Sequence, residues 1–189
     1  MTSAEPSQRG VGMVFQEPMT SLNPTQRIGR QIAEVLSLHR GMGYATARGL
    51  VIDALKQVGI GNAERRLEQF PHELSGGLRQ RVMIAMAPSC QPKLLIADEP
   101  TTALDVTIQA QILELLGDLQ RELGSAILLI THDLDTLYEI CDRVAVISGG
   151  RVLAADTVAG LTRGGSLHDR FLELVGATDT GGDGLAWLG

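Results

Sequence analysis

Apolar residues recur along this chain with two different spacings, which separate a helical first half from a second half of strands and helices. In residues 17–89 the apolar positions have helical spacing, as in Ile28, Ile32 and Leu36. A spacing of i, i+4 and i+8 predicts an amphipathic helix. From Lys93 onward, short aliphatic runs alternate with longer amphipathic stretches, a pattern typical of a parallel sheet. The sequence therefore predicts a mostly helical insert attached to an α/β core.

The same pattern divides the chain into four predicted segments. These are a tail with a first strand (1–16), a helical subdomain (17–89), an α/β core (90–155) and a C-terminal helix with a Gly/Asp/Thr-rich tail (156–189). The predicted strands are 11–15, 94–97, 126–130, 144–147 and an antiparallel edge strand at 151–155, and the predicted helices include 63–69, 78–87 and 167–175. A long helix between the second and third strands should face inward with Val106, Ile112, Leu113, Leu116 and Leu119.

Two adjacent carboxylates, Asp98 and Glu99, directly follow the aliphatic run Leu94–Ala97. A run without alternation predicts a strand buried on both faces, and open α/β sheets bind ligands at the carboxyl ends of their strands. One carboxylate there can hold Mg²⁺, while its neighbour, which points to the other side, can polarise an attacking water. The alternative interpretation is a pair of solvated loop acids.

Four further polar features have both a structural and a functional interpretation. Ser75 with Gly76 and Gly77 precedes a helix, which predicts either an ordinary N-cap or a phosphate-binding helix start. Gln16 ends the first strand, where it is either a functional residue at the sheet edge or simply a polar turn residue. The other two features are His132, which follows an aliphatic strand, and Asp105, which precedes the long helix and is expected to cap it.

Taken together, these motifs resemble the nucleotide-binding subunits of ATP-binding-cassette (ABC) transporters. The stretches Val14–Pro24 and Leu94–Thr107 are similar to those of oligopeptide and dipeptide importer ATPases, and the likeness runs from about Arg9 to about Ala155. The resemblance implies an α/β P-loop NTPase (ABC ATPase) core with a mostly parallel sheet and a helical subdomain. The N-terminal part of that core is expected to be missing here.

The resemblance also implies a role for each candidate residue, with ATP and Mg²⁺ as cofactors. Asp98 and Gln16 would hold the metal, Glu99 would be the general base, and His132 and Gln16 would act at the γ-phosphate and the attacking water. The residues implied to bind ATP held by an opposite subunit are Ser75, Gly76, Gly77, Gln80 and Asp105. The cysteine-containing extension usual in peptide importers is absent, and residues 166–176 look more like the closing helix of some exporter ATPases.

By resemblance, the protein would be an ATPase subunit that hydrolyses ATP to drive an importer for peptides or related solutes. Its implied partners are a second ABC ATPase subunit, in a homo- or heterodimer, and integral membrane permease subunits. The helical insert would dock on cytoplasmic loops of the permease, which implies a peripheral position at the inner face of the plasma membrane. The alternative function is a truncated, non-catalytic remnant or interaction module that cannot bind ATP alone.

This alternative is prompted by the phosphate-binding loop, GxxxxGK[ST], which does not occur in the 189 residues. The chain has two lysines, Lys56 and Lys93, and neither follows a glycine or precedes Ser or Thr. In the family the strand before that loop lies between the strands that correspond to 126–130 and 144–147. We therefore expect those two strands to lack their shared neighbour, and the isolated chain to fold poorly or aggregate, as a truncated or split gene product would.

Composition narrows the function classes further. A net charge of −6 argues against a nucleic-acid partner, and together with the lack of zinc motifs or basic inserts it disfavours a soluble ABC ATPase that acts on DNA or ribosomes. No apolar run approaches the ~20 residues that span a bilayer. Cys90 and Cys141 belong to no CxxC pair and are expected to be reduced, buried thiols.

Overall fold

The computed structural model describes residues 10–17, 21–87, 92–102, 104–134, 137, 140–162 and 165–176. The chain divides into two compact units, the first ending at Thr131 and the second beginning at His132. This division falls inside the predicted core segment 90–155, and the predicted boundaries at 16, 89 and 155 remain predictions. Each unit is described by itself.

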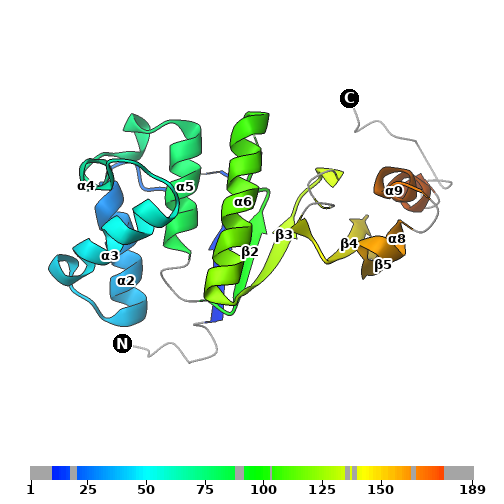
Figure 1. Cartoon of the computed structure of the whole chain (residues 1–189), viewed down its shortest axis with the longest axis horizontal. Coiled ribbons are helices and arrows are strands. Elements are labelled where there is room, and N and C mark those ends of the chain that lie inside the picture. Colours follow the sequence, from blue (N-terminus) through cyan, green and yellow to red (C-terminus); the bar gives the residue numbers. More distant parts are fainter. Residues whose placement is uncertain are drawn as a thin grey trace. The chain divides into compact units, whose positions relative to one another are not determined.

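The first unit contains a three-stranded parallel sheet in the order β1-β2-β3 (Figure 1). The strands are β1 (Val11–Val14), β2 (Leu94–Asp98) and β3 (Ala126–Ile130). In this register Val14 pairs with Ala97, and Asp98 pairs with Ile130. All three strands therefore end at one edge of the sheet, as the βαβ pattern predicts.

The helices of the first unit follow the predicted insert and crossover. They are α2 (Ile28–Arg40), α3 (Tyr44–Gln57), α4 (Ala63–Arg66), the 3₁₀ turn η2 (Pro71–Glu73), α5 (Gly76–Met86) and α6 (Val106–Leu123). In Figure 1, α2 to α5 lie together on one side of α6, and α6 lies across β2. Gly41 and Gly124 end α2 and α6 in left-handed conformations, which glycine adopts without steric cost.

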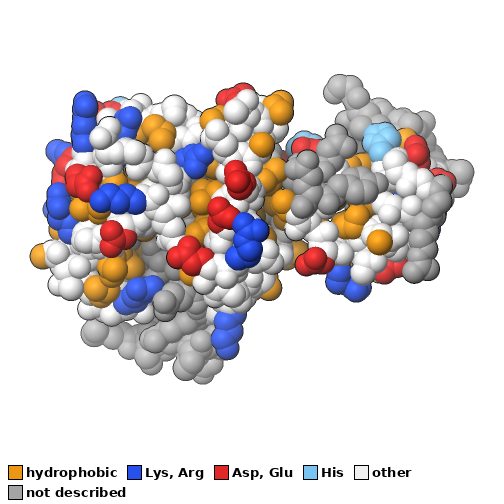
Figure 2. Space-filling model, viewed as in Figure 1, with side chains coloured by type: hydrophobic (Ala, Val, Ile, Leu, Met, Phe, Trp, Pro, Cys, Tyr) orange, Lys and Arg blue, Asp and Glu red, His pale blue; other side chains and the backbone are white. Residues whose placement is uncertain are grey.

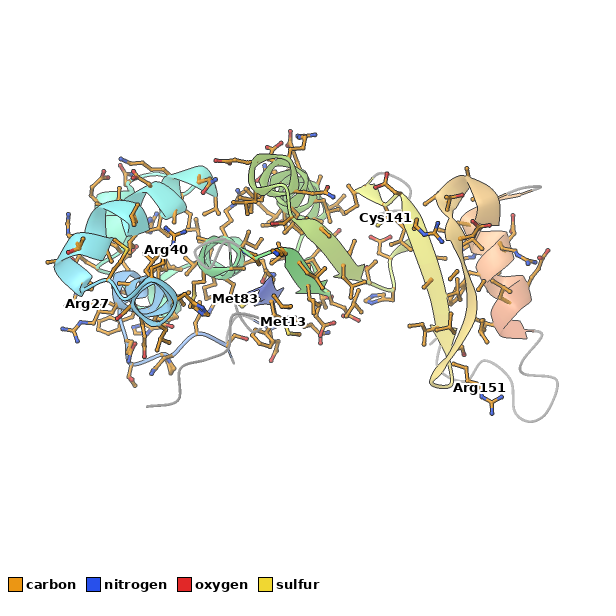
Figure 3. All side chains as sticks on the ribbon, turned by 90° about the horizontal axis from the view of Figure 1, so that it is seen from below. Met13, Arg27, Arg40, Met83, Cys141 and Arg151 are labelled. Atoms are coloured by element: carbon orange, nitrogen blue, oxygen red, sulfur yellow. The ribbon has the colours of Figure 1, made fainter. Side chains whose placement is uncertain are left out.

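One hydrophobic core joins the insert to the sheet. Its fully buried members come from nearly every element and include Val14, Ile28, Ile32, Leu55, Ile84, Leu95, Ala97, Ile112, Leu116 and Leu119. Figure 3 shows Met83 of α5 close to β1, at the place where the insert meets the sheet. The insert and the sheet therefore share one packed interior.

Three predictions of detail are wrong. The charged helix predicted over 63–69 is only one turn, Ala63–Arg66. Val106 was predicted to face inward, yet it is 81% exposed, because it is the first residue of α6 and precedes the packed turns. The strands are also less buried than their composition suggests: β2 alternates between buried and half-buried residues, and Leu128 of β3 is 50% exposed.

The second unit is a hairpin with two helices. Strands β4 (Arg143–Ser148) and β5 (Arg151–Thr157) pair antiparallel, and Gly149 and Gly150 form the turn with positive φ angles. Arg151 extends outward beside this turn (Figure 3). The helices are α8 (Val158–Leu161) and α9 (Leu167–Gly176). Among the described strands, β4 pairs with β5 and not with β3, so the two strands expected to lack a shared neighbour belong to different sheets.

Candidate functional site: the carboxyl edge of the parallel sheet

The carboxyl edge of the sheet brings together Gln16 and Glu99, which are 83 residues apart in the chain. The Gln16 Nε2 group donates a hydrogen bond of 2.7 Å to Glu99 Oε2. The parallel pairing of Val14 with Ala97 explains this contact, because Gln16 lies two positions after Val14 and Glu99 lies two positions after Ala97. Two of the predicted catalytic residues therefore lie side by side, as their positions at strand ends suggested.

Asp98 is the last residue of β2 and is half-buried. Glu99 follows β2 directly and has a left-handed backbone, so the alternation of side chains along the strand does not fix its direction relative to Asp98. The predicted division of roles, with a cation at one carboxylate and a water at the other, remains a prediction. Within the described residues no group of three or more His, Cys, Asp or Glu side chains gathers as a metal site. Mg²⁺ needs no such group, because it is usually bound by one or two carboxylates together with substrate phosphates.

Glu99 has a backbone φ of +44°, which is rare for a residue other than glycine. Its amide donates to the Ile130 carbonyl at 2.8 Å and its carbonyl accepts from the Thr102 amide at 3.2 Å. The Thr102 hydroxyl also donates to Glu99 Oε2, at 2.9 Å. A strained backbone of this kind persists only where several surrounding contacts hold it in place, and such residues are frequent at functional sites.

The serine–glycine turn begins α5 as predicted. The Ser75 hydroxyl accepts a hydrogen bond from the Leu78 amide at 3.4 Å, which confirms that Ser75 is the N-cap. A Cβ atom on Gly77 would lie 3.1 Å from Ile108 Cγ2, so the glycine also lets α5 approach α6. Both the structural and the phosphate-binding interpretations of this turn remain compatible with its geometry.

Asp105 caps α6, as expected: its Oδ1 accepts from the Ile108 amide at 3.0 Å. Because Ile108 packs against Gly77, and the Gly76 Cβ position lies 3.8 Å from Leu104, the N-termini of α5 and α6 are neighbours. Helix N-termini carry unpaired N–H groups and a partial positive charge, so this pair is suited to an anion. The predicted role of Asp105 at a dimer interface stays a prediction.

Gln80 differs from the other predicted nucleotide contacts, because it is only 2% exposed. Its Nε2 atom is buried and has no hydrogen-bond partner in the described part of the chain. A side chain in this position contributes to the interior of the helical insert, and a phosphate would reach it only after the helix was uncovered. The predicted contact of Gln80 with ATP therefore has no support from its burial.

His132 is exposed and is the first residue of the second unit. Its predicted contact with the γ-phosphate remains a prediction. Cys141 is a free, half-buried thiol, and burial followed by the charge of Asp142 raises its pKa. Cys90 lies outside the described residues.

Sequence reasoning missed two residues that shape this region. Thr102 enters the sequence analysis only as part of the stretch Leu94–Thr107. A hydroxyl three positions after an acid can nevertheless donate a hydrogen bond to the carboxylate in a tight turn. Arg81 donates to the Val58 carbonyl at 2.8 Å and to Gln111 Oε1 at 2.8 Å, which ties α5 to α3 and α6. No sequence signal indicated this link, because it depends on the packing of three helices.

A parallel sheet with helices and with acids at its carboxyl edge places the chain among the α/β proteins, whose open sheets bind ligands at that edge. The family profile described as ABC transporter matches residues 1–102, and the chain belongs to that family. Its fold is shared with solved ABC ATPases. A structure titled "Structure of ATP binding subunit of ABC transporter" has a TM-score of 0.72 and 29% identity, covering 89% of this chain and 69% of the other. A dimeric post-hydrolysis state of the ATP-binding cassette MJ0796, bound to ADP and Pi, has a TM-score of 0.69 and 29% identity, covering 80% and 65%.

Curated relatives are more similar in sequence. The oligopeptide transport ATP-binding protein OppD of Bacillus subtilis is 56% identical over 148 residues, which are 78% of this chain and 41% of that protein. The peptidoglycan transport ATP-binding protein YejF of Agrobacterium fabrum is 59% identical over 148 residues, 78% of this chain and 27% of that protein. The chain thus spans less than half the length of these relatives. No helix in the described residues is long and apolar enough to cross a bilayer.

Proposed function

We propose that this chain supplies the magnesium and catalytic-base half of an ABC ATPase site that hydrolyses ATP to drive the uptake of peptides or related solutes. The observation that carries the proposal is the contact between Gln16 and Glu99 at the edge that also bears Asp98. Family membership and the names of the relatives support the class of reaction.

The residues at this edge fit Mg²⁺ and a nucleotide phosphate chemically. The Asp98 carboxylate and the Gln16 side-chain carbonyl are hard oxygen donors, the kind that Mg²⁺ prefers. The hydrogen bond to Glu99 uses the Gln16 nitrogen and leaves that carbonyl oxygen out of the contact. When bound, Mg²⁺ would neutralise charge on the phosphates. Asp98 and Gln16 would hold it, and Glu99 would take the proton of the attacking water.

The proposed assembly follows the family pattern. A second ABC ATPase subunit, identical or different, would present its helix start at Ser75, Gly76 and Gly77 to the nucleotide, and Asp105 would lie near the contact between subunits. Permease subunits would bind the helical insert at the inner face of the plasma membrane. His132 would contact the γ-phosphate. The relatives are named for oligopeptide and for peptidoglycan transport, so the proposed solute is a peptide or peptide-containing molecule.

Calorimetric titration of the chain with ATP, with and without Mg²⁺, separates this function from the alternative of a non-catalytic remnant. The proposal predicts binding that requires Mg²⁺ and that Asp98→Asn weakens at least tenfold. Failure of the wild-type chain to bind Mg-ATP at millimolar concentration would favour the alternative of a non-catalytic remnant. Such a remnant keeps the residues at the carboxyl edge of the sheet but cannot bind ATP alone.

Glu99→Gln separates catalysis from binding. The amide keeps the size of the side chain and cannot accept the proton of water, so affinity for Mg-ATP should change little while turnover falls about 10²–10⁴-fold. Asp118→Asn, a change at an exposed carboxylate of α6, serves as the matched control and should leave both quantities unchanged. Equal turnover in Glu99→Gln and wild type would remove Glu99 from the proposed role.

A further inference from the structure

The Glu99 carboxylate accepts hydrogen bonds from two side chains, one distant in the sequence and one in the same turn. Gln16 reaches it from another strand end, across 83 residues of chain. Thr102 reaches it from within the same turn, three residues away. Both donors bond to the same oxygen, Oε2, and together they restrict the position of that oxygen at the sheet edge.

The two contacts should respond differently to a bound nucleotide. Gln16 is itself a candidate ligand of Mg²⁺ through its carbonyl oxygen, so a bound cation would act on the same amide group that donates to Glu99. Thr102 is not among the candidate ligands of the metal or the nucleotide. Its amide bonds to the Glu99 carbonyl at 3.2 Å, so the turn keeps the hydroxyl beside the carboxylate whether or not Gln16 stays.

The unusual backbone of Glu99 makes this local contact more important. A left-handed φ of +44° aims the side chain in a direction that an ordinary strand end would not give. The bonds from the Glu99 amide to Ile130 and from the Thr102 amide to Glu99 hold the backbone, while the Thr102 hydroxyl holds the end of the side chain. The side-chain torsions of Glu99 are therefore restricted at both ends. The entropic cost of this restriction is small, because the turn already holds the Thr102 hydroxyl in place.

We propose that Thr102 is a positioning residue for Glu99: its hydroxyl holds the carboxylate in the direction needed to take a proton from water, independently of Gln16. The proposal rests on the role of Glu99 in the proposed function. Thr102 does not touch the reacting atoms, so its effect on the reaction is indirect. Removing its hydroxyl should therefore cost less than removing the base, about tenfold in turnover against the ~10²–10⁴-fold of general-base catalysis, with the KM for Mg-ATP changed less than twofold.

Three variants test this in the full chain. Thr102→Val keeps the shape and removes the donor, Thr102→Ser keeps the donor, and Thr46→Val makes the same chemical change at an exposed threonine of α3. The first readout needs no nucleotide: the side-chain carboxyl carbon of Glu99 is observed by NMR in chain labelled with ¹³C-glutamate, and its resonance is assigned by its loss in Glu99→Gln. The second readout is the kcat and KM of ATP hydrolysis.

The resonance should move in Thr102→Val and stay near its wild-type position in Thr102→Ser and Thr46→Val, and kcat should follow the same order. Coincident resonances for wild type and Thr102→Val, failure of Thr102→Ser to restore the wild-type values, or a moved resonance with unchanged kcat would each overturn the proposal. Circular dichroism checks that each variant is folded. If the wild-type chain hydrolyses no ATP, the proposed function fails, and the resonance alone decides the positioning role.

Discussion

Gln31 organises the loop that leads from the sheet edge into the helical insert, and its replacement should measurably destabilise the first unit. The side chain is 6% exposed and all of its hydrogen bonds go to this loop. Its Oε1 accepts from the Asn23 amide at 2.9 Å, while Nε2 donates to the carbonyls of Asn23 at 3.0 Å and Gln26 at 2.9 Å. Gln31→Leu keeps a similar volume and removes the whole set.

The expected loss follows from these contacts. Each intramolecular hydrogen bond contributes about 0.5–1.5 kcal/mol net, so three bonds represent roughly 1.5–4.5 kcal/mol. Asn23 is exposed, so water can replace part of what is lost, and the buried leucine recovers about 1 kcal/mol. The remainder is about 2 kcal/mol, which shifts the urea midpoint by roughly 1 M at a slope of about 2 kcal/mol per M.

Urea unfolding followed by circular dichroism measures this difference. Gln120→Leu, at an exposed position of α6, is the matched control and should stay within about 0.5 kcal/mol of wild type. Gln31→Glu should be at least as damaging as Gln31→Leu, since it buries a charge and sets an oxygen against two carbonyls. If Gln31→Leu unfolds at the wild-type urea midpoint, the three hydrogen bonds of Gln31 do not stabilise the first unit, and the prediction is refuted.

Three further predictions concern other parts of the molecule. Because half-burial and the Asp142 charge raise the pKa of the Cys141 thiol, alkylation of Cys141 in a Cys90→Ser chain at pH 8 should be slower than in urea, and Asp142→Asn should speed it; equal rates would contradict this. Gly77→Ala and Ile108→Ala should couple by about 0.5–2 kcal/mol in a double-mutant unfolding cycle, because the new methyl group would meet Ile108, and additive effects would argue against that contact. Leu128→Lys on the exposed face of β3 should reduce self-association in sedimentation velocity, and an unchanged sedimentation profile would exclude this surface as its cause.

The arrangement of the sheet edge could be predicted because it depends on rules that act locally and on topology. Two parallel strands that each end in a polar residue must bring those residues to the same edge, which placed Gln16 beside Glu99. The caps Ser75 and Asp105 were recognisable because each precedes an apolar periodic run and supplies a side-chain acceptor.

The remaining features depend on packing that periodicity does not contain. Val106 fits the inward stripe of its helix but sits before the first packed turn. The exposure of Leu128 depends on which strand neighbours β3, and not on its own sequence. Gln31 and Gln80 look alike as polar residues on helices, and both are buried. The Gln31 side chain has three hydrogen bonds, whereas the Gln80 Nε2 atom has no partner among the residues that the structure describes.

The described surface that Figure 2 shows is not dominated by basic side chains. In the view of Figure 2, Lys and Arg side chains are intermixed with Asp and Glu over the described surface. Arg27 illustrates the local use of these charges: it lies at the start of α2, 5.2 Å from the Phe70 ring centroid, and donates to the Glu68 carbonyl at 2.6 Å. Arg27 thus contacts a loop of its own insert.

The central claim is that Gln16, Asp98 and Glu99 surround one metal–nucleotide site, and paramagnetic broadening by Mn²⁺ with ATP tests it most directly. Mn²⁺ accepts the same hard oxygen ligands as Mg²⁺ and broadens NMR signals of nearby nuclei. The account predicts that the backbone amide signals of these three residues broaden first, while that of Arg40, at the far end of α2, persists. Broadening that begins elsewhere, or none at all at millimolar Mn-ATP, would contradict the account.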